Sequence, residues 1–183
     1  LGRGAWAERV LEALSAFQGP MVIDADGLYW LADREAWCQR GLSGKPLFLT
    51  PHAAEASRLL NLSVADVINQ TVQSVADMAE RYDATCLLKG PGTVMGDQRS
   101  QAICGHGNPG MATAGMGDVL AGLAASLIAQ QLGDMPAAFC TAVLLHSAAG
   151  DLAAAEIGER GVTASAVISR VAALLQEVPS VTG

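Results

Sequence analysis

The chain has 183 residues, of which 51% are hydrophobic and 16% are charged, and its formal net charge is −7. This composition is typical of one globular domain with a core, here taken as residues 1–183, and it argues against a disordered chain. The 11 basic residues form no basic run and are outnumbered by 18 acids, so we expect no nucleic-acid partner.

The N-terminal half of the chain alternates helical periodicity with short apolar runs. A helix is predicted over 5–17, a strand over 21–26 ("MVIDAD"), a short helix over 27–32 and a second strand over 46–50 ("PLFLT"). One of the two acids that close the first strand is a candidate cap for the helix that follows.

The next predicted helices cover 51–62, with Pro51 at the first position, and 63–82, with Ser63 as the cap. A third apolar strand follows over 84–90, and a hairpin is predicted over 93–104, around Gly96 and Asp97. Three further helices are predicted over 118–132, 135–158 and 163–178. Strands that are apolar on both faces and alternate with helices indicate an α/β fold with a mainly parallel sheet.

Polar residues follow each predicted strand. Ligands of parallel α/β sheets bind beyond the carboxyl ends of the strands, so these residues are expected to share one rim. They are Asp24 and Asp26 after the first strand, Thr50, His52 and Glu55 after the second, Lys89 and Gly90 after the third, and Asp118 after the hairpin.

The stretch "NPGMATAGMGDVLAG", residues 108–122, places four glycines and one acid at the entrance of an apolar helix. Glycine is about 1 kcal/mol less favourable than alanine inside a helix, but it allows tight turns and close approach of a ligand. The free N–H groups at a helix start bind anions, phosphate above all. Asp118 is either an ordinary helix-start acid or a general base for a hydroxyl that is being phosphorylated.

Four segments, "TAGMGDVLAG", "TPHAAEASRLL", "VIDADGLYWLA" and "LLKGPGTVMGD", resemble the ADP- or ATP-dependent NAD(P)H-hydrate dehydratases, a branch of the ribokinase-like superfamily. The resemblance runs from Leu1 to about Leu175. It implies a ribokinase-like fold and a metabolite-repair lyase that turns NADHX or NADPHX back into NADH or NADPH. The implied co-substrate is ADP or ATP, used with Mg²⁺.

The resemblance also implies the site residues. Asp118 would be the catalytic acid or base at the substrate, His52 a contact to the hydrated dinucleotide, and Glu55 a group that serves magnesium through phosphate. The implied nucleotide contacts are Lys89, Gly90, Pro91, Gly92, Thr93 and Gly117. The implied anion hole consists of Ala114, Gly115, Met116 and Gly117.

Three departures from the family pattern stand out. Ala53 and Ala54 replace its Pro-Gly, and alanine does not take a positive φ without strain. Tyr29 stands where the family usually has asparagine. The opening "LGRG" resembles the tail of the family's GPGLG turn, so the family's first strands would lie before residue 1, and the chain is either a fragment or an abbreviated relative.

Simpler explanations exist for each residue. His52 fits a helix-start histidine without a ligand, Glu55 a first-turn acid, and Lys89 a solvated lysine at a strand end. For the whole chain, the alternatives are a ribokinase-superfamily kinase for a vitamin precursor or sugar and a non-catalytic nucleotide-binding module. The alanine-rich helices after residue 119 are candidates for a homo-oligomer interface.

Cysteine usage and hydropathy bear on the compartment. The apolar segments 119–130 and 135–150 fall short of the roughly 20 apolar residues that a membrane span needs, so no span is expected. The thiols form no C-x-x-C pair, which favours buried, reduced cysteines and a cytoplasmic protein. They are Cys38, Cys86, Cys104 and Cys140.

Overall fold

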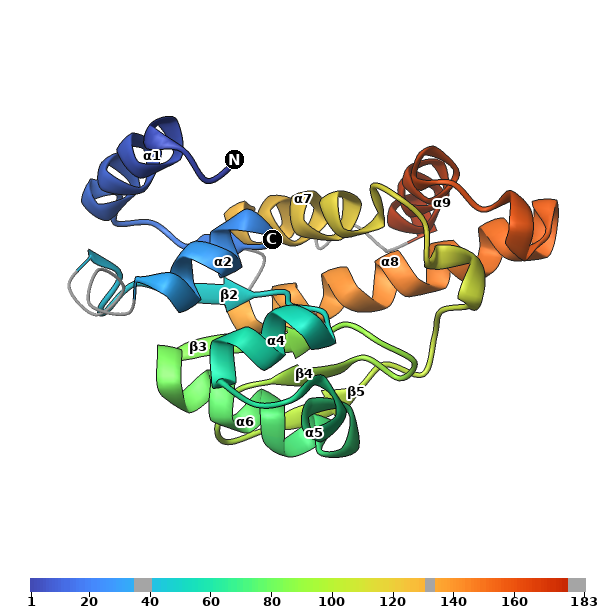
Figure 1. Ribbon diagram of the computed structural model, residues 1–183. Coiled ribbons are helices and arrows are strands. Elements are labelled where there is room, and N and C mark those ends of the chain that lie inside the picture. Colours follow the sequence, from blue (N-terminus) through green and yellow to red (C-terminus); the bar gives the residue numbers. More distant parts are fainter. Residues whose placement is uncertain (35–40, 131–133, 178–183) are drawn as a thin grey trace. The chain divides into compact units, whose positions relative to one another are not determined.

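The computed structural model describes residues 1–34, 41–130 and 134–177 (Figure 1). The chain divides into two compact units, Leu1–Ile103 and Cys104–Gly183. The first unit contains a five-stranded sheet with its helices, and the described residues of the second unit form helices and loops.

The sheet has the order β1-β2-β3-β4-β5. Its strands are β1 (Met21–Ile23), β2 (Leu47–Leu49), β3 (Ala84–Leu88), β4 (Val94–Gly96) and β5 (Gln101–Ile103). The first three strands are parallel, whereas β3, β4 and β5 are antiparallel neighbours. The α/β prediction and the predicted hairpin are confirmed, but the sheet as a whole is mixed and not mainly parallel.

The helices of the first unit are α1 (Ala5–Ala16), α2 (Asp26–Asp33), α4 (Ala53–Leu60), α5 (Val64–Asn69) and α6 (Thr71–Tyr82). The single helix predicted over 63–82 is wrong, because the chain leaves helical geometry at Gln70, which has φ −130° and ψ 46°. Ser63 does cap α5, since its Oγ accepts a hydrogen bond from the Asp66 N–H at 3.1 Å. Pro51 is not in the first turn of α4, because His52 is the N-cap.

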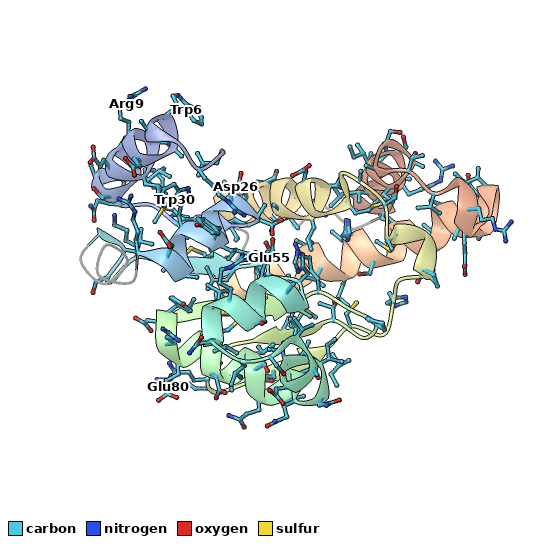
Figure 2. The ribbon with its side chains drawn as sticks, viewed as in Figure 1. Trp6, Arg9, Asp26, Trp30, Glu55 and Glu80 are labelled. Atoms are coloured by element: carbon cyan, nitrogen blue, oxygen red, sulfur yellow. The ribbon has the colours of Figure 1, made fainter. Side chains whose placement is uncertain are left out.

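The core of the first unit lies between the sheet and its helices. All five residues of β3, the strand in the middle of the sheet order, are buried. Val75, Met78 and Ala79 line one side of α6 at helical spacing and join the same core. Helix α1 is attached separately, through a small cluster in which Trp30 of α2 packs against Ala7 and Leu11 (Figure 2).

The second unit is built around one long helix. Its elements are the 3₁₀ turn η1 (Pro109–Met111), α7 (Met116–Ala129), α8 (Met135–Ile157), the 3₁₀ turn η2 (Glu159–Gly161) and α9 (Ala164–Glu177). Helix α8 packs against both α7 and α9. The alanines of α8 at positions 149 and 153, one turn apart, let the core residues Met116 of α7 and Val167 of α9 come close.

Among the described residues, one helix is long and apolar enough to cross a membrane by length and composition. This is α8, with 23 residues and a mean hydropathy of 1.4 in its most apolar window. From the sequence, only the apolar segment 135–150 was considered, and it is shorter than a membrane span. The helix itself continues beyond Gly150 to Ile157. With 44% of that window buried, α8 also fits the core helix of a soluble protein, which passes the same test.

The described cysteines agree with the prediction of buried thiols. Cys86 and Cys104 are buried and Cys140 is half-buried, whereas Cys38 lies outside the described residues. Burial raises the pKa of the Cys86 thiol, so this thiol stays protonated at neutral pH.

Candidate functional site

The carboxyl ends of β1, β2 and β3 lie side by side. The parallel pairing extends beyond the strands: the Thr50 N–H donates to the Ile23 carbonyl at 3.2 Å, and the Lys89 N–H donates to the Pro51 carbonyl at 2.8 Å. His52 and Lys89 form an isolated parallel bridge. The predicted rim is therefore confirmed within the first unit, where it gathers the residues that follow these three strands.

Lys89 sits between two carboxylates at this rim. Its Nζ lies 2.8 Å from Oδ1 of Asp24 and 4.0 Å from Oε2 of Glu55. The three side chains are only 24%, 14% and 15% exposed, respectively. The alternative of a solvated lysine is therefore wrong. We call Asp24, His52, Glu55 and Lys89 the rim cluster.

Glu55 lies in the first turn of α4 (Figure 2) and forms a capping box with His52. Nδ1 of His52 accepts hydrogen bonds from the N–H groups of Ala54 at 3.1 Å and Glu55 at 3.3 Å. In return, Oε2 of Glu55 accepts from the His52 N–H at 2.9 Å. Because Nδ1 is an acceptor, a neutral ring carries its proton on Nε2. The ring is 54% exposed, so it caps the helix and can still meet a ligand.

The structure shows how the chain accommodates two departures from the family pattern, at Ala53-Ala54 and at Tyr29. Ala53 and Ala54 are the first two residues of α4, so neither needs the positive φ that alanine avoids. Tyr29 serves as an aromatic platform, with the guanidinium carbon of Arg3 at 3.8 Å and that of Arg58 at 5.3 Å from the ring centre. Both distances are within the range of cation–π contacts.

The two aspartates after β1 have different partners. Asp24 pairs with Lys89, whereas Asp26 accepts from the Gly2 N–H at 2.8 Å, a bond that lowers the pKa of Asp26. Neither side chain caps α2, so that prediction is wrong. Between them Ala25 adopts φ 50° and ψ −118°, a strained geometry for a residue other than glycine. Such strain, about 1–3 kcal/mol, is characteristic of functional sites held by their surroundings.

The loop from Lys89 to Thr93 closes on itself between β3 and β4. Thr93 Oγ1 donates to the Gly90 carbonyl at 3.2 Å. Gly92 has a φ of +72°, which favours glycine. The sequence pattern predicted this loop but not the contact between Lys89 and Asp24, because the two residues are 65 positions apart.

In the second unit, the glycine-rich stretch forms a tight turn at the start of α7. Gly115 is the N-cap, with a φ of 86°, and a Cβ at this position would lie 3.2 Å from that of Ala164. Asp118 is the third residue of α7 and the acid of its first turn, as the helix-start alternative expects, but it makes no capping hydrogen bond. Among the described residues, the N–H groups of Gly117 and Asp118 find no acceptor.

Asp118 stands at one end of a pocket between α7 and α9. The pocket has a volume of about 490 Å³. Apart from Asp118, its lining is mostly apolar, and consists of Val119, Gly122, Leu123, Ser126, Ile168 and Val171. Within the described ranges the Asp118 carboxylate has no hydrogen-bond or ion-pair partner. It is therefore available as a proton acceptor, although its position relative to the rim cluster stays a prediction.

The described residues offer no ready metal centre. No group of three or more His, Cys, Asp or Glu side chains among them could hold an ion. Both oxygens of Glu55 face donors from His52 and Lys89, so Glu55 does not fit a direct magnesium ligand. Magnesium generally keeps several of its waters and binds through one or two carboxylates together with substrate phosphates.

Comparison with known proteins gives a consistent result. A family model described as NAD(P)H-hydrate dehydratase matches residues 1–172. The bifunctional NAD(P)H-hydrate repair enzyme of Coxiella burnetii is 43% identical over 171 residues, covering 90% of this chain and 33% of that protein. The corresponding enzyme of Vibrio cholerae is 39% identical over 175 residues, covering 96% and 34%. The chain thus spans about a third of the length of these relatives.

Solved structures agree on the fold. The ADP/ATP-dependent NAD(P)H-hydrate dehydratase from Bacillus subtilis, co-crystallised with ATP/Mg²⁺, matches with a TM-score of 0.82 at 21% identity, covering 96% of this chain and 61% of that chain. A ribokinase-like superfamily protein from Enterococcus faecalis matches with a TM-score of 0.80 at 27% identity, covering 96% and 60%. The predicted ribokinase-like fold is confirmed.

Proposed function

The chain belongs to the NAD(P)H-hydrate dehydratase family, and we propose that it catalyses the nucleotide-dependent return of hydrated NADH or NADPH to the normal dinucleotide. The main support for this proposal is the environment of Asp118. Its carboxylate has no partner among the described residues and stands beside two free N–H groups at the start of α7.

The chemistry needs a proton acceptor. The hydrated nicotinamide ring carries a hydroxyl group that leaves poorly as hydroxide. In the proposed reaction its oxygen attacks the terminal phosphorus of ADP or ATP, the bond to the leaving nucleotide breaks, and Asp118 takes the hydroxyl proton. The ring–oxygen bond then breaks with release of phosphate, and a neighbouring ring carbon loses a proton to restore the double bond.

The start of α7 would stabilise the group in transfer. Gly115 bears no side chain, so a phosphoryl group can approach the N–H groups of Gly117 and Asp118 closely. The segment from Ala114 to Gly117 is thus our proposed anion hole. In comparable electrostatic holes, one donor is worth about 2.7–4 kcal/mol in the transition state.

The first unit would supply binding contacts. We assign the Lys89–Thr93 loop to the nucleotide and the exposed His52 ring to the hydrated dinucleotide. The ammonium of Lys89 already faces Asp24 and Glu55, so it offers less charge to a phosphate than an unpaired lysine would. Lys89 would therefore act mainly by holding its loop, and the nucleotide would meet the loop's backbone and Thr93.

Turnover separates the candidate functions. The purified chain is incubated with hydrated NADH and either ADP or ATP, and NADH and nucleotide product are followed together. The proposal requires one NADH for each nucleotide consumed. A chain that phosphorylates hydroxyethylthiazole or hydroxymethylpyrimidine and forms no NADH would be a kinase. Nucleotide binding without any turnover would indicate a binding module.

A further inference from the structure

Residues 107–111 lead into the glycine-rich turn and are held by α8. We call them the approach segment. We propose that Asp151 of α8 is a positioning residue that holds the approach segment and thereby places the phosphate-binding start of α7. This inference rests on the proposed function of Asp118 and its neighbouring N–H groups, and it adds a residue that acts through Gly107 and Asn108.

Both carboxylate oxygens of Asp151 accept hydrogen bonds from the approach segment. Oδ2 accepts from the Gly107 N–H at 3.0 Å, and Oδ1 accepts from Nδ2 of Asn108 at 3.0 Å. Nδ1 of His106 lies 3.4 Å from Oδ2. Each donor meets its own carboxylate oxygen, whereas an asparagine here would present an oxygen to one donor and an NH2 group, itself a donor, to the other.

The side-chain amide of Asn108 contacts both Asp151 and the following turn η1. Its Oδ1 accepts from the Gly110 N–H at 3.0 Å and caps η1. In this orientation the Nδ2 at the other end of the amide points to Oδ1 of Asp151 on α8. Asp151 therefore determines which way the Asn108 amide faces, and with it the geometry of the turn before Gly115.

Packing holds the segment from both sides. A Cβ at Gly150, the neighbour of Asp151, would lie 2.2 Å from the Sδ of Met111. A Cβ at Gly110 would lie 2.2 Å from the Glu159 carbonyl oxygen of η2. Both glycines are needed because the segment presses against α8 and η2. Only residues 112–114 separate it from Gly115, so a shift of the segment moves the start of α7.

The carboxylate is ionised at neutral pH. Burial acts to raise the pKa of Asp151, but the hydrogen bonds from Asn108 and Gly107 and the nearby His106 ring outweigh it, and the pKa is lowered. A charged acceptor makes shorter and stronger hydrogen bonds than a neutral one.

The test combines three variants of the full chain. Asp151→Asn leaves one of the two N–H donors without an acceptor. The double variant Asn108→Asp/Asp151→Asn exchanges the two groups: Asp at 108 accepts from Gly110 and from the new amide, whose oxygen accepts from Gly107. Glu156→Gln is the matched control, because Glu156 is also on α8 and pairs with Arg170 at the surface.

We expect Asp151→Asn to lower kcat by about 10²-fold, as a misplaced group does, with KM for the hydrate nearly unchanged. Amide hydrogen exchange in residues 107–118 should become faster. The double variant should regain most of both properties, and Glu156→Gln should match the parent. A purely structural role would lower the melting temperature of Asp151→Asn, but would leave kcat per folded molecule unchanged.

Failure of this inference differs from failure of the proposed function. If the parent shows no turnover, the proposed function is wrong, and exchange in residues 107–118 together with AMP affinity by calorimetry still tests the inference. Parent-like kcat and exchange in Asp151→Asn, or no recovery in the double variant, would overturn the positioning role of Asp151.

Discussion

Lys89 and Asp24 are 65 residues apart in the sequence, and Nζ of the first lies 2.8 Å from Oδ1 of the second. The pair connects the end of β3 to the end of β1 across the intervening β2. With Glu55 near the same ammonium, one cation compensates two carboxylates at the carboxyl edge of the sheet.

Lys89→Ala should therefore destabilise the chain. Breaking a fully buried ion pair costs about 3–5 kcal/mol, and partial exposure to water reduces this, so we expect a loss of about 1–3 kcal/mol in the free energy of unfolding. Urea denaturation measures it. In the double variant Lys89→Ala/Asp24→Asn, part of the loss should be recovered, because one uncompensated carboxylate is removed. Equal stability of parent and Lys89→Ala would contradict the structural role.

Asp118→Asn should separate catalysis from stability. The carboxylate caps nothing and has no partner among the described residues, so stability should stay within about 1 kcal/mol, the size of a charge–dipole effect. As a base, asparagine fails, and the rate should fall by about 10²–10⁴. ADP affinity should change little because the N–H groups remain.

The matched control for this experiment is Asp134→Asn. Asp134 is also a helix-start acid, and its carboxylate caps α8 by accepting from the Ala137 N–H at 3.4 Å. Asparagine is as good a cap, so neither rate nor stability should change. The base assignment is wrong if Asp118→Asn keeps most of the parent's rate.

Gly115→Ala should weaken both folding and phosphate binding. Alanine at a φ of +86° is strained by about 1–2 kcal/mol, and its Cβ would meet that of Ala164 at 3.2 Å. Calorimetry with ADP and thermal unfolding measure the two effects. Gly122→Ala is the control for folding on the same helix: among the described residues nothing lies within 4 Å of a Cβ built there, so alanine should add up to about 1 kcal/mol of stability.

Two substitutions of His52 should separate its cap from its proposed ligand contact. His52→Ala removes the capping acceptor and should cost about 0.5–2 kcal/mol, whereas His52→Asn keeps a good cap and should preserve stability. Both remove the exposed ring, so KM for the hydrated dinucleotide should rise in both variants. An unchanged KM in His52→Asn would leave His52 as a helix cap alone.

Stability should depend on pH through Asp151. Its pKa is lowered in the folded chain, so its contribution is present above the unfolded value of about 3.9 and is lost as the pH falls through the folded value. The stability gap between parent and Asp151→Asn should therefore shrink below about pH 4. The pKa of Asp97 is lowered by hydrogen bonds from the Ser100 and Arg99 N–H groups. The stability difference between the parent and Asp97→Asn should therefore also shrink as the pH falls below about 4. A gap independent of pH would contradict this linkage.

The sequence by itself determined the elements that depend on local patterns. Apolar runs closed by polar residues located β1, β2 and β3, and glycines located the turn at 115, because positive φ is a local property of the backbone. The same patterns located α7 and α9. They did not show the break at Gln70, because the apolar periodicity continues across it.

Only the tertiary structure decided which polar groups meet. Lys89 reaches Asp24 because the parallel register of β1, β2 and β3 places the three strand ends side by side, and no spacing along the chain encodes that register. Asp151 accepts a hydrogen bond from Asn108 because α8 packs beside the segment that leads into α7. Helices, strands and turns depend on residues that are near one another in the sequence, so they could be predicted from it. Hydrogen bonds and ion pairs between distant residues depend on how the elements pack, so they could be identified only in the tertiary structure.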